Sequence, residues 1–166
     1  MTVRHDWLVE LLAKFFRSAQ AIVHIEPRIY DSDRLRPDLD IMFPNRRILV
    51  DVTIVHPTSP SRTSRIELSA AAAAEAQKTR QYSALARNHG ASLLALAMES
   101  YGAFGKEATE LMRILMTALD SNSSFNISQA VNCGYPVQAI SVALQRGNCL
   151  VMSSGALDAR AVELAQ

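Results

Sequence analysis

The chain has 166 residues, of which 49% are hydrophobic and 20% are charged, and its formal net charge at pH 7 is +1. This length suits one domain with a sizeable core, and the apolar content excludes a largely disordered chain. The near-neutral charge argues against a protein that coats nucleic acid through bulk electrostatics. Two cysteines are too few for a disulfide framework or a zinc site, which favours a reducing, intracellular compartment. Every apolar run falls short of the roughly 18 residues that span a bilayer, so no membrane partner is expected.

Hydrophobic periodicity divides the chain into helices and strands. Apolar residues recur at helical spacing from Trp7 to Phe16, whereas apolar and polar residues alternate singly from Asp38 onward. A continuous apolar run from Ala91 to Met98 is typical of a strand buried on both faces. The patterns predict, in chain order, helix 4–19, strands 21–29, 38–43 and 48–55, helix 66–88, strand 91–98, and helices 105–119 and 136–152.

These elements predict an α/β fold with a central mixed sheet of about four strands flanked by helices. We expect residues 1–120 to form the core and residues 121–166 to form a helical C-terminal extension packed on the same domain. Gly147 is expected to be a weak point of the last helix, because glycine disfavours helix interiors.

Three aspartates gather on the predicted hairpin. If residues 44–47 form its turn, alternation places Asp38, Asp40 and Asp51 on one face, with Asp40 directly opposite Asp51 and Asp38 opposite Thr53. Like charges so placed repel each other. A hard cation such as Mg²⁺ would relieve the repulsion, because it prefers oxygen ligands. The alternative is an ordinary solvated face of an antiparallel pair.

The predicted helix 66–88 brings a charged pair to its apolar side. At about 100° per residue, one stripe of this helix carries mostly apolar residues together with one glutamate and one lysine; its members are Leu68, Ala71, Glu75, Lys78, Tyr82 and Leu85. A Glu–Lys pair is ordinary on a solvated surface. On a stripe that faces the sheet it indicates a metal-phosphate site beside Asp51, the alternative being that both side chains reach the rim as an ordinary pair.

Basic residues exceed acidic ones around this region. Positions 28 to 87 hold ten Lys or Arg (28, 34, 36, 46, 47, 62, 65, 78, 80, 87) and seven Asp or Glu (31, 33, 38, 40, 51, 67, 75). A basic rim around an acidic centre suits a phosphate ligand and a metal. Arg36, Arg46 and Arg47 are the candidates for contacts with DNA phosphates. The four histidines, at positions 5, 24, 56 and 89, share no metal-ligand spacing.

The spacing of these motifs resembles that of the PD-(D/E)XK nucleases. Arg36-Pro37-Asp38 is followed thirteen residues later by Asp51-Val52-Thr53 in an apolar strand, and then by Glu75-Ala76-Gln77-Lys78 with Tyr82 on the next helix. More narrowly, the chain looks like the restriction-like endonuclease domain of site-specific non-LTR retrotransposon polyproteins. The resemblance extends loosely over residues 4–152 and implies a restriction-endonuclease-like core.

The resemblance also implies the metal ligands. Asp38 and Asp51 would bind Mg²⁺ or Mn²⁺ together with the backbone carbonyl of Val52, and Asp40 and Glu10 are additional candidates. The motif points to Asp38 as the first ligand, whereas the expected hairpin register points to Asp40. We expect Asp38 to be the ligand and Asp40 to be an outer residue or the partner of a nearby arginine.

The resemblance assigns the remaining catalytic roles to the helix. Thr53 stands where the commoner motif has its lysine, so Lys78 would position or deprotonate the attacking water and Tyr82 would support it one turn later. The implied function is a metal-dependent DNA endonuclease that nicks target DNA to prime reverse transcription.

The implied partners are DNA and a reverse transcriptase domain of the same parent polyprotein, and the implied location is nuclear if the source is a eukaryotic retroelement. The sequence leaves open whether the chain is a fragment, a truncated copy or a stand-alone derivative of such a polyprotein. A catalytically inactive nuclease fold that binds nucleic acid or a partner chain is the alternative.

Overall fold

The computed structural model describes residues 3–27, 35–57, 69–121 and 134–164, with side chains described as far as residue 154. Its elements are α1 (Val3–Ser18), β1 (Ile22–Ile25), β2 (Leu39–Phe43), β3 (Arg46–Val55), α2 (Ser69–Asn88), β4 (Ser92–Glu99), α3 (Lys106–Ser121) and α5 (Tyr135–Leu164). Each helix and strand predicted from the sequence is confirmed, with ends that differ by a few residues except for α5, which ends at Leu164 and not at 152. The end of predicted strand 21–29 and the start of predicted helix 66–88 lie outside the described residues.

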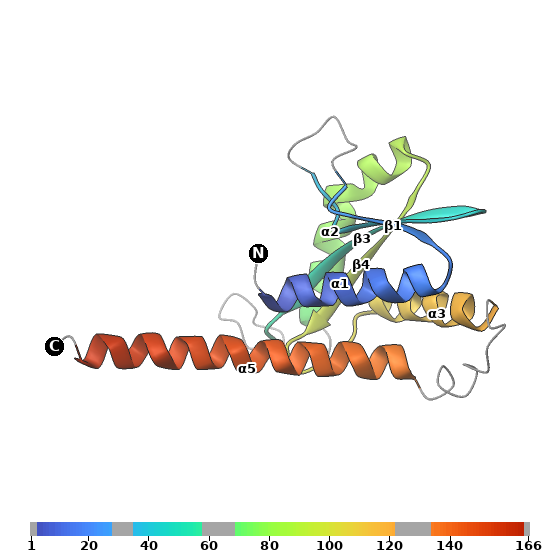
Figure 1. Cartoon of the computed structure of the whole chain (residues 1–166). Helices are drawn as coiled ribbons and strands as arrows, with labels where there is room; N and C mark the ends of the chain where they lie inside the picture. The colour runs from blue at the N-terminus through green and yellow to red at the C-terminus, as the bar shows by residue number, and fades with distance from the viewer. Residues whose placement is uncertain (1–2, 28–34, 58–68, 122–133, 165–166) are drawn as a thin grey trace.

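The four strands form one mixed sheet in the order β1-β2-β3-β4 (Figure 1). β2 pairs antiparallel with both β1 and β3, whereas β4 runs parallel to β3. Parallel neighbours require a crossover connection, and α2 supplies it between β3 and β4. The predicted α/β class and mixed four-stranded sheet are therefore confirmed.

Helices cover both faces of this sheet (Figure 1). α2 lies on one face, where Leu49 of β3 packs against Ala86. α1, α3 and α5 lie on the other face and enclose the main core. The fully buried large side chains of that core are Leu8, Leu12, Phe16, Leu39, Ile41, Ile48, Leu96, Met98, Leu111, Leu115 and Ile140. α5 contributes Ile140 and Leu144 to the same cluster, so the C-terminal helix is part of this core.

The hairpin between β2 and β3 has a shorter turn than the sequence predicts. Phe43 pairs with Arg46, which leaves a two-residue turn at positions 44–45. The predicted turn at 44–47 is wrong, and so is the register that placed Asp40 opposite Asp51. Asp40 instead faces Leu49 across the hairpin. Continued by one residue, the observed register sets Asp38 level with Asp51.

The two arginines after the turn belong to the strand because their side chains find partners along it. The guanidinium of Arg46 lies 5.6 Å from the centroid of the Phe43 ring. Arg47 donates from Nε to Asp40 Oδ1 at 2.9 Å and from Nη2 to Oδ2 at 2.6 Å. These contacts extend β3 by two residues toward the turn, which produces the shift of register.

α5 continues beyond the predicted end at residue 152 and passes through Gly147 without a break. Beyond that end, the hydroxyl groups of Ser153 and Ser154 each donate to a backbone carbonyl four residues earlier, at 2.8 and 2.9 Å. A Cβ at Gly147 would lie 2.6 Å from Cγ of Arg4. The glycine therefore lets α1 pack closely on α5, and the helix continues through the predicted weak point.

Candidate active site

Asp51 lies on the face of the sheet that α2 covers, and Asp38, directly before β2, lies level with it where the side chains of α1 also reach. The exposed fractions of Asp38 and Asp51 are 7% and 3%. Oδ2 of Asp38 accepts the backbone N–H of Val52 at 2.6 Å, and the backbone carbonyl of Asp38 accepts the N–H of Glu26 at 2.8 Å. Both the side chain and the main chain of Asp38 are therefore held in place by neighbouring strands.

Two side chains of α2 reach the same point. Nζ of Lys78 lies 2.9 Å from Oδ2 of Asp51 and 5.8 Å from the centroid of the Tyr82 ring. The hydroxyl of Tyr82 donates to the backbone carbonyl of Arg36 at 2.9 Å, two residues before Asp38. Lys78 and Tyr82 are four residues apart and thus share one face of the helix. The helix places an ammonium group and a phenol beside the two carboxylates.

The sheet-facing stripe predicted for α2 is present, because Ala71, Glu75 and Tyr82 are buried. The site predicted for Glu75 is wrong, however. Its Oε1 accepts the backbone N–H groups of Glu107 at 2.8 Å and Ala108 at 3.3 Å. These N–H groups lie in the first turn of α3 and have no partner within that helix. Glu75 therefore stabilises the start of α3 and does not share a metal-phosphate site with Asp51.

Asp40 is fully buried and bound through both carboxylate oxygens to Arg47. A bidentate pair of this kind fixes both side chains. Asp40 is thus the partner of a nearby arginine, and both of its oxygens already have strong donors. The structure brings Asp38, and not Asp40, level with Asp51.

His5 is a member of the site that the sequence reasoning missed. Its Nε2 lies 3.2 Å from Oδ2 of Asp38, and its Nδ1 lies 3.2 Å from Oδ1 of Asp6. The hydrogen bond with Asp38 raises the pKa of His5 to about 9, against the opposing effect of burial. His5 is 33 residues from Asp38 in the chain and shares no spacing with another ligand. Only the packing of α1 could have revealed this contact.

Negative charge is held at this point in a poorly hydrated environment. Burial raises the pKa of Asp51, and the neighbouring charge of Asp38 adds to that effect while Lys78 opposes it. Burial also raises the pKa of the Tyr82 hydroxyl, with a further contribution from Asp51. Thr53 donates its hydroxyl to Oδ2 of Asp51 at 3.2 Å. A site where ionised carboxylates are disfavoured by burial gains from an additional cation.

Three other predicted residues, Arg36, Arg46 and Glu10, have exposed side chains. Arg36 has an exposed side chain directly before Pro37, and Arg46 is exposed at the hairpin end of β3. Glu10 is exposed on α1 and lines a surface hollow with Lys14. Within the described chain, no hydrogen bond or ion pair joins Glu10 to either site aspartate.

The donor set fits a hard divalent ion. Asp38, Asp51 and the backbone carbonyl of Val52 would supply oxygen ligands, which Mg²⁺ and Mn²⁺ prefer. The hydrogen bonds and the ion pair described above all fall on the Oδ2 atoms of the two aspartates. In the described ranges, no group of three or more His, Cys, Asp or Glu side chains is arranged so that it could hold a metal ion. A metal here would thus rest on two carboxylates and main-chain oxygen.

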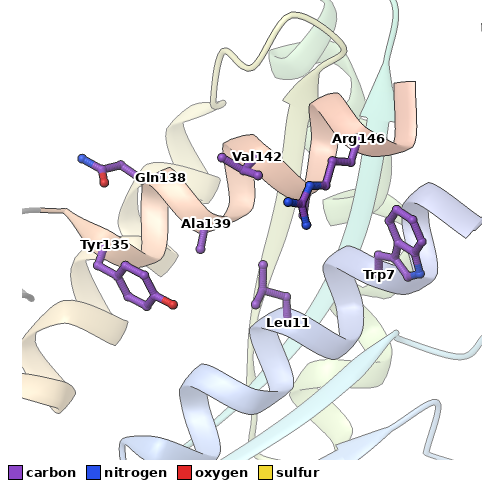
Figure 2. Close-up of a pocket in the computed structure, with 8 residues that line it drawn as sticks. Trp7, Leu11, Tyr135, Gln138, Ala139, Val142 and Arg146 are labelled. Carbon is purple, nitrogen blue, oxygen red and sulfur yellow. The ribbon is translucent and has the colours of Figure 1, made fainter. Parts of the chain in front are cut away.

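A separate apolar hollow of about 560 Å³ lies between α1 and α5 (Figure 2). Trp7, Leu11 and Val142 form much of its wall, and Arg146 reaches into it from α5 (Figure 2). α1 and α5 lie on the face of the sheet opposite to α2. This hollow is therefore distinct from the site formed by Asp51 and Lys78.

A scan against protein-family models finds no match to this chain, and a search of curated proteins finds none either. None of the helices in the described ranges is long and apolar enough to cross a membrane.

Proposed function

We propose that this protein is a metal-dependent DNA endonuclease that hydrolyses phosphodiester bonds. The observation that carries the proposal is the convergence of Asp38, directly before β2, with Asp51 of β3 and Lys78 of α2. Lys78 is within 2.9 Å of Asp51, and Asp38 is level with Asp51 across the hairpin. Burial of these charged groups costs desolvation free energy, and a metal ion bound between the two carboxylates would offset that cost.

Each side chain has a role that follows from its surroundings. The carboxylates of Asp38 and Asp51 would hold Mg²⁺ or Mn²⁺, which when bound stabilises charge on the scissile phosphate and lowers the pKa of a coordinated water. Lys78 would hold the attacking water, because its ammonium group lies 2.9 Å from Oδ2 of Asp51. Tyr82 would keep that ammonium group in place through ring contact and would anchor the segment before Asp38.

By the resemblance to retrotransposon nuclease domains, the substrate would be target DNA, and the product a nick that primes reverse transcription. Exposed Arg36, two residues before Asp38, is the arginine best placed to contact a phosphate beside the cleaved bond. Arg47 is less suited, because Asp40 occupies its guanidinium. A reverse transcriptase domain of the same parent polyprotein would be the natural partner.

A second function is favoured by one observation. Lys78 and His5 already contact Asp51 and Asp38, so the two carboxylates have cationic neighbours without a metal. An inactive nuclease fold that binds nucleic acid would keep such an arrangement after losing catalysis. This alternative predicts DNA binding that is independent of divalent ions and is never followed by cleavage.

Plasmid nicking separates the two functions. Purified protein is incubated with supercoiled plasmid in Mg²⁺, Mn²⁺ or EDTA, and the relaxed product is quantified alongside the Asp51→Ala variant. The endonuclease nicks in either metal, stops in EDTA and loses activity in the variant while its circular dichroism spectrum is retained. Absence of nicking by the wild-type protein in both metals, or equal nicking by Asp51→Ala, would rule out the enzymatic function.

A further inference from the structure

A polar junction joins the first turn of α1 to the middle of α5 and to the end of β4. Nη1 of Arg4 donates to Oδ1 of Asn148 at 2.6 Å, and Nδ2 of Asn148 donates to the backbone carbonyl of Ser100 at 2.7 Å. The N–H of Ser100 in turn donates to the carbonyl of Val55, the last residue of β3, at 2.8 Å. One asparagine therefore ties α1 to the strand ends on the same sheet that carries the site.

The backbone of Arg4 is fixed as closely as its side chain. A Cβ at Gly147 would lie 2.6 Å from Cγ, 2.7 Å from Cβ and 3.1 Å from Cα of Arg4. Gly147 directly precedes Asn148 on α5. The glycine leaves room for the aliphatic part of the Arg4 side chain, and Asn148 binds its guanidinium group. Arg4 is thereby held along its length against α5.

His5 follows Arg4 directly and carries the contact with Asp38. The first turn of a helix lacks intrahelical partners for its N–H groups and frays unless other contacts hold it. α1 begins at Val3, so both Arg4 and His5 lie in that turn. The described contacts that hold this turn near the sheet are those of Arg4 with α5 and of His5 with Asp38.

Stability alone does not account for a polar junction at this place. Within the described chain, Nε of Arg4 and Oγ of Ser100 are buried and have no hydrogen-bond partner. Each such atom costs free energy that an apolar contact between two helices would avoid. Hydrogen bonds are directional, however, so they fix the relative position of the two helices more strictly than apolar packing does.

We propose that Asn148 is a positioning residue for the nuclease site: by holding Arg4 it sets His5 against Asp38, the first metal ligand of the proposed function on which this inference rests. A ligand carboxylate that is fixed by a second hydrogen bond is oriented before the metal arrives, and loss of such outer partners costs about 10- to 100-fold in affinity or activity. α5, which contributes no group to the chemistry, thus controls the geometry of the site through one amide.

Two variants break the junction from opposite sides, and a third serves as control. Asn148→Ala removes the amide, and Arg4→Met keeps an aliphatic stem against Gly147 but removes the guanidinium. Ser154→Ala removes an exposed hydroxyl on the same helix, which donates to the backbone carbonyl of Leu150 within α5. The imidazole resonances of His5 are followed by ¹H–¹³C NMR without metal, and kcat for plasmid nicking is measured in Mn²⁺.

Both junction variants should move the His5 resonances toward those of an exposed histidine and should lower nicking by about tenfold, while Ser154→Ala changes neither. In a His5→Ala background, Asn148→Ala should cause no further loss, because its effect passes through His5. Unchanged His5 resonances in Arg4→Met and Asn148→Ala, or a full additional loss in the His5→Ala background, would overturn the inference. Shifted resonances in a protein that never nicks would support the positioning role and reject the proposed function.

Discussion

The ammonium group of Lys78 lies 2.9 Å from Oδ2 of Asp51, although the lysine belongs to a helix and the aspartate to the middle of a buried strand. The exposed fractions of these side chains are 24% and 5%. A pair so poorly hydrated adds little net stability, because desolvation offsets the attraction between the charges. Its place beside Asp38 favours a chemical role over a structural one.

Replacement of Lys78 by methionine should therefore affect nicking much more than folding. We expect Lys78→Met to lower kcat by about 10²- to 10⁴-fold, the usual contribution of a positioned proton-transfer group. Arg80→Met, on the exposed side of the same helix, is the matched control and should nick at the wild-type rate. Single-turnover nicking assays measure both. Equal activity of the two variants would remove Lys78 from the mechanism.

Divalent ions should stabilise the fold through the same carboxylates. An ion that binds only the folded state contributes about 2.7 kcal/mol at a concentration of one hundred times its dissociation constant. For a chain of this size that corresponds to a rise in Tm of roughly 5–10 °C. Thermal unfolding with Mn²⁺ and with EDTA measures the effect. Asp51→Asn should abolish the difference, and a similar rise in wild type and variant would show that the ion binds elsewhere.

Glu75 should prove structural. Glu75→Ala removes the acceptor at the start of α3 and should lower the free energy of unfolding by about 1–2 kcal/mol, as loss of a helix cap does. Gln77→Ala, exposed on the same helix, should have little effect. Urea denaturation gives the stabilities, and nicking well below the midpoint should be unchanged. If Glu75→Ala lost nicking activity while its free energy of unfolding stayed unchanged, Glu75 would have a role in the active site.

The stability of the metal-free protein should fall at alkaline pH because of His5. Its folded-state pKa, raised to about 9 from an ordinary 6.5, means that the folded protein holds this proton more tightly than the unfolded chain. The contribution is fully present below pH 6.5 and is lost as pH rises through 9. Urea denaturation in EDTA across this range should show a steeper decline for wild type than for His5→Asn. Parallel profiles would contradict the contact with Asp38.

Periodicity predicted the fold well because the relevant interactions are local. The alternation along β2 and β3 and the apolar stripe of α2 follow from burial of one face, and burial depends on residue type at fixed spacing. Lys78 and Tyr82 could therefore be assigned to the face of α2 that meets the sheet. Arg46 and Arg47 looked like turn residues, yet each finds a partner along the hairpin, and the register shifted accordingly.

The missed features depend on contacts between distant segments. His5 reaches Asp38 from a helix packed beneath the sheet, and Asn148 reaches Arg4 across 144 residues of chain. Glu75 lies on the predicted stripe, but its partner is the N-terminus of α3, which no spacing in α2 could indicate. Tertiary packing decides these roles, and a single sequence carries no local pattern for them.

The central claim, that Asp38 and Asp51 form the metal site, is tested most directly by plasmid nicking in Mn²⁺ with Asp38→Asn and Asp40→Asn compared side by side. Asp38→Asn should lose nicking by at least about 10³-fold, because it removes a proposed metal ligand and its charge from the site. Asp40→Asn breaks the pair with Arg47 and should lower stability by about 1–3 kcal/mol, yet nick normally while folded. Loss of nicking only in Asp40→Asn, or no nicking by the wild-type protein, would contradict the assignment.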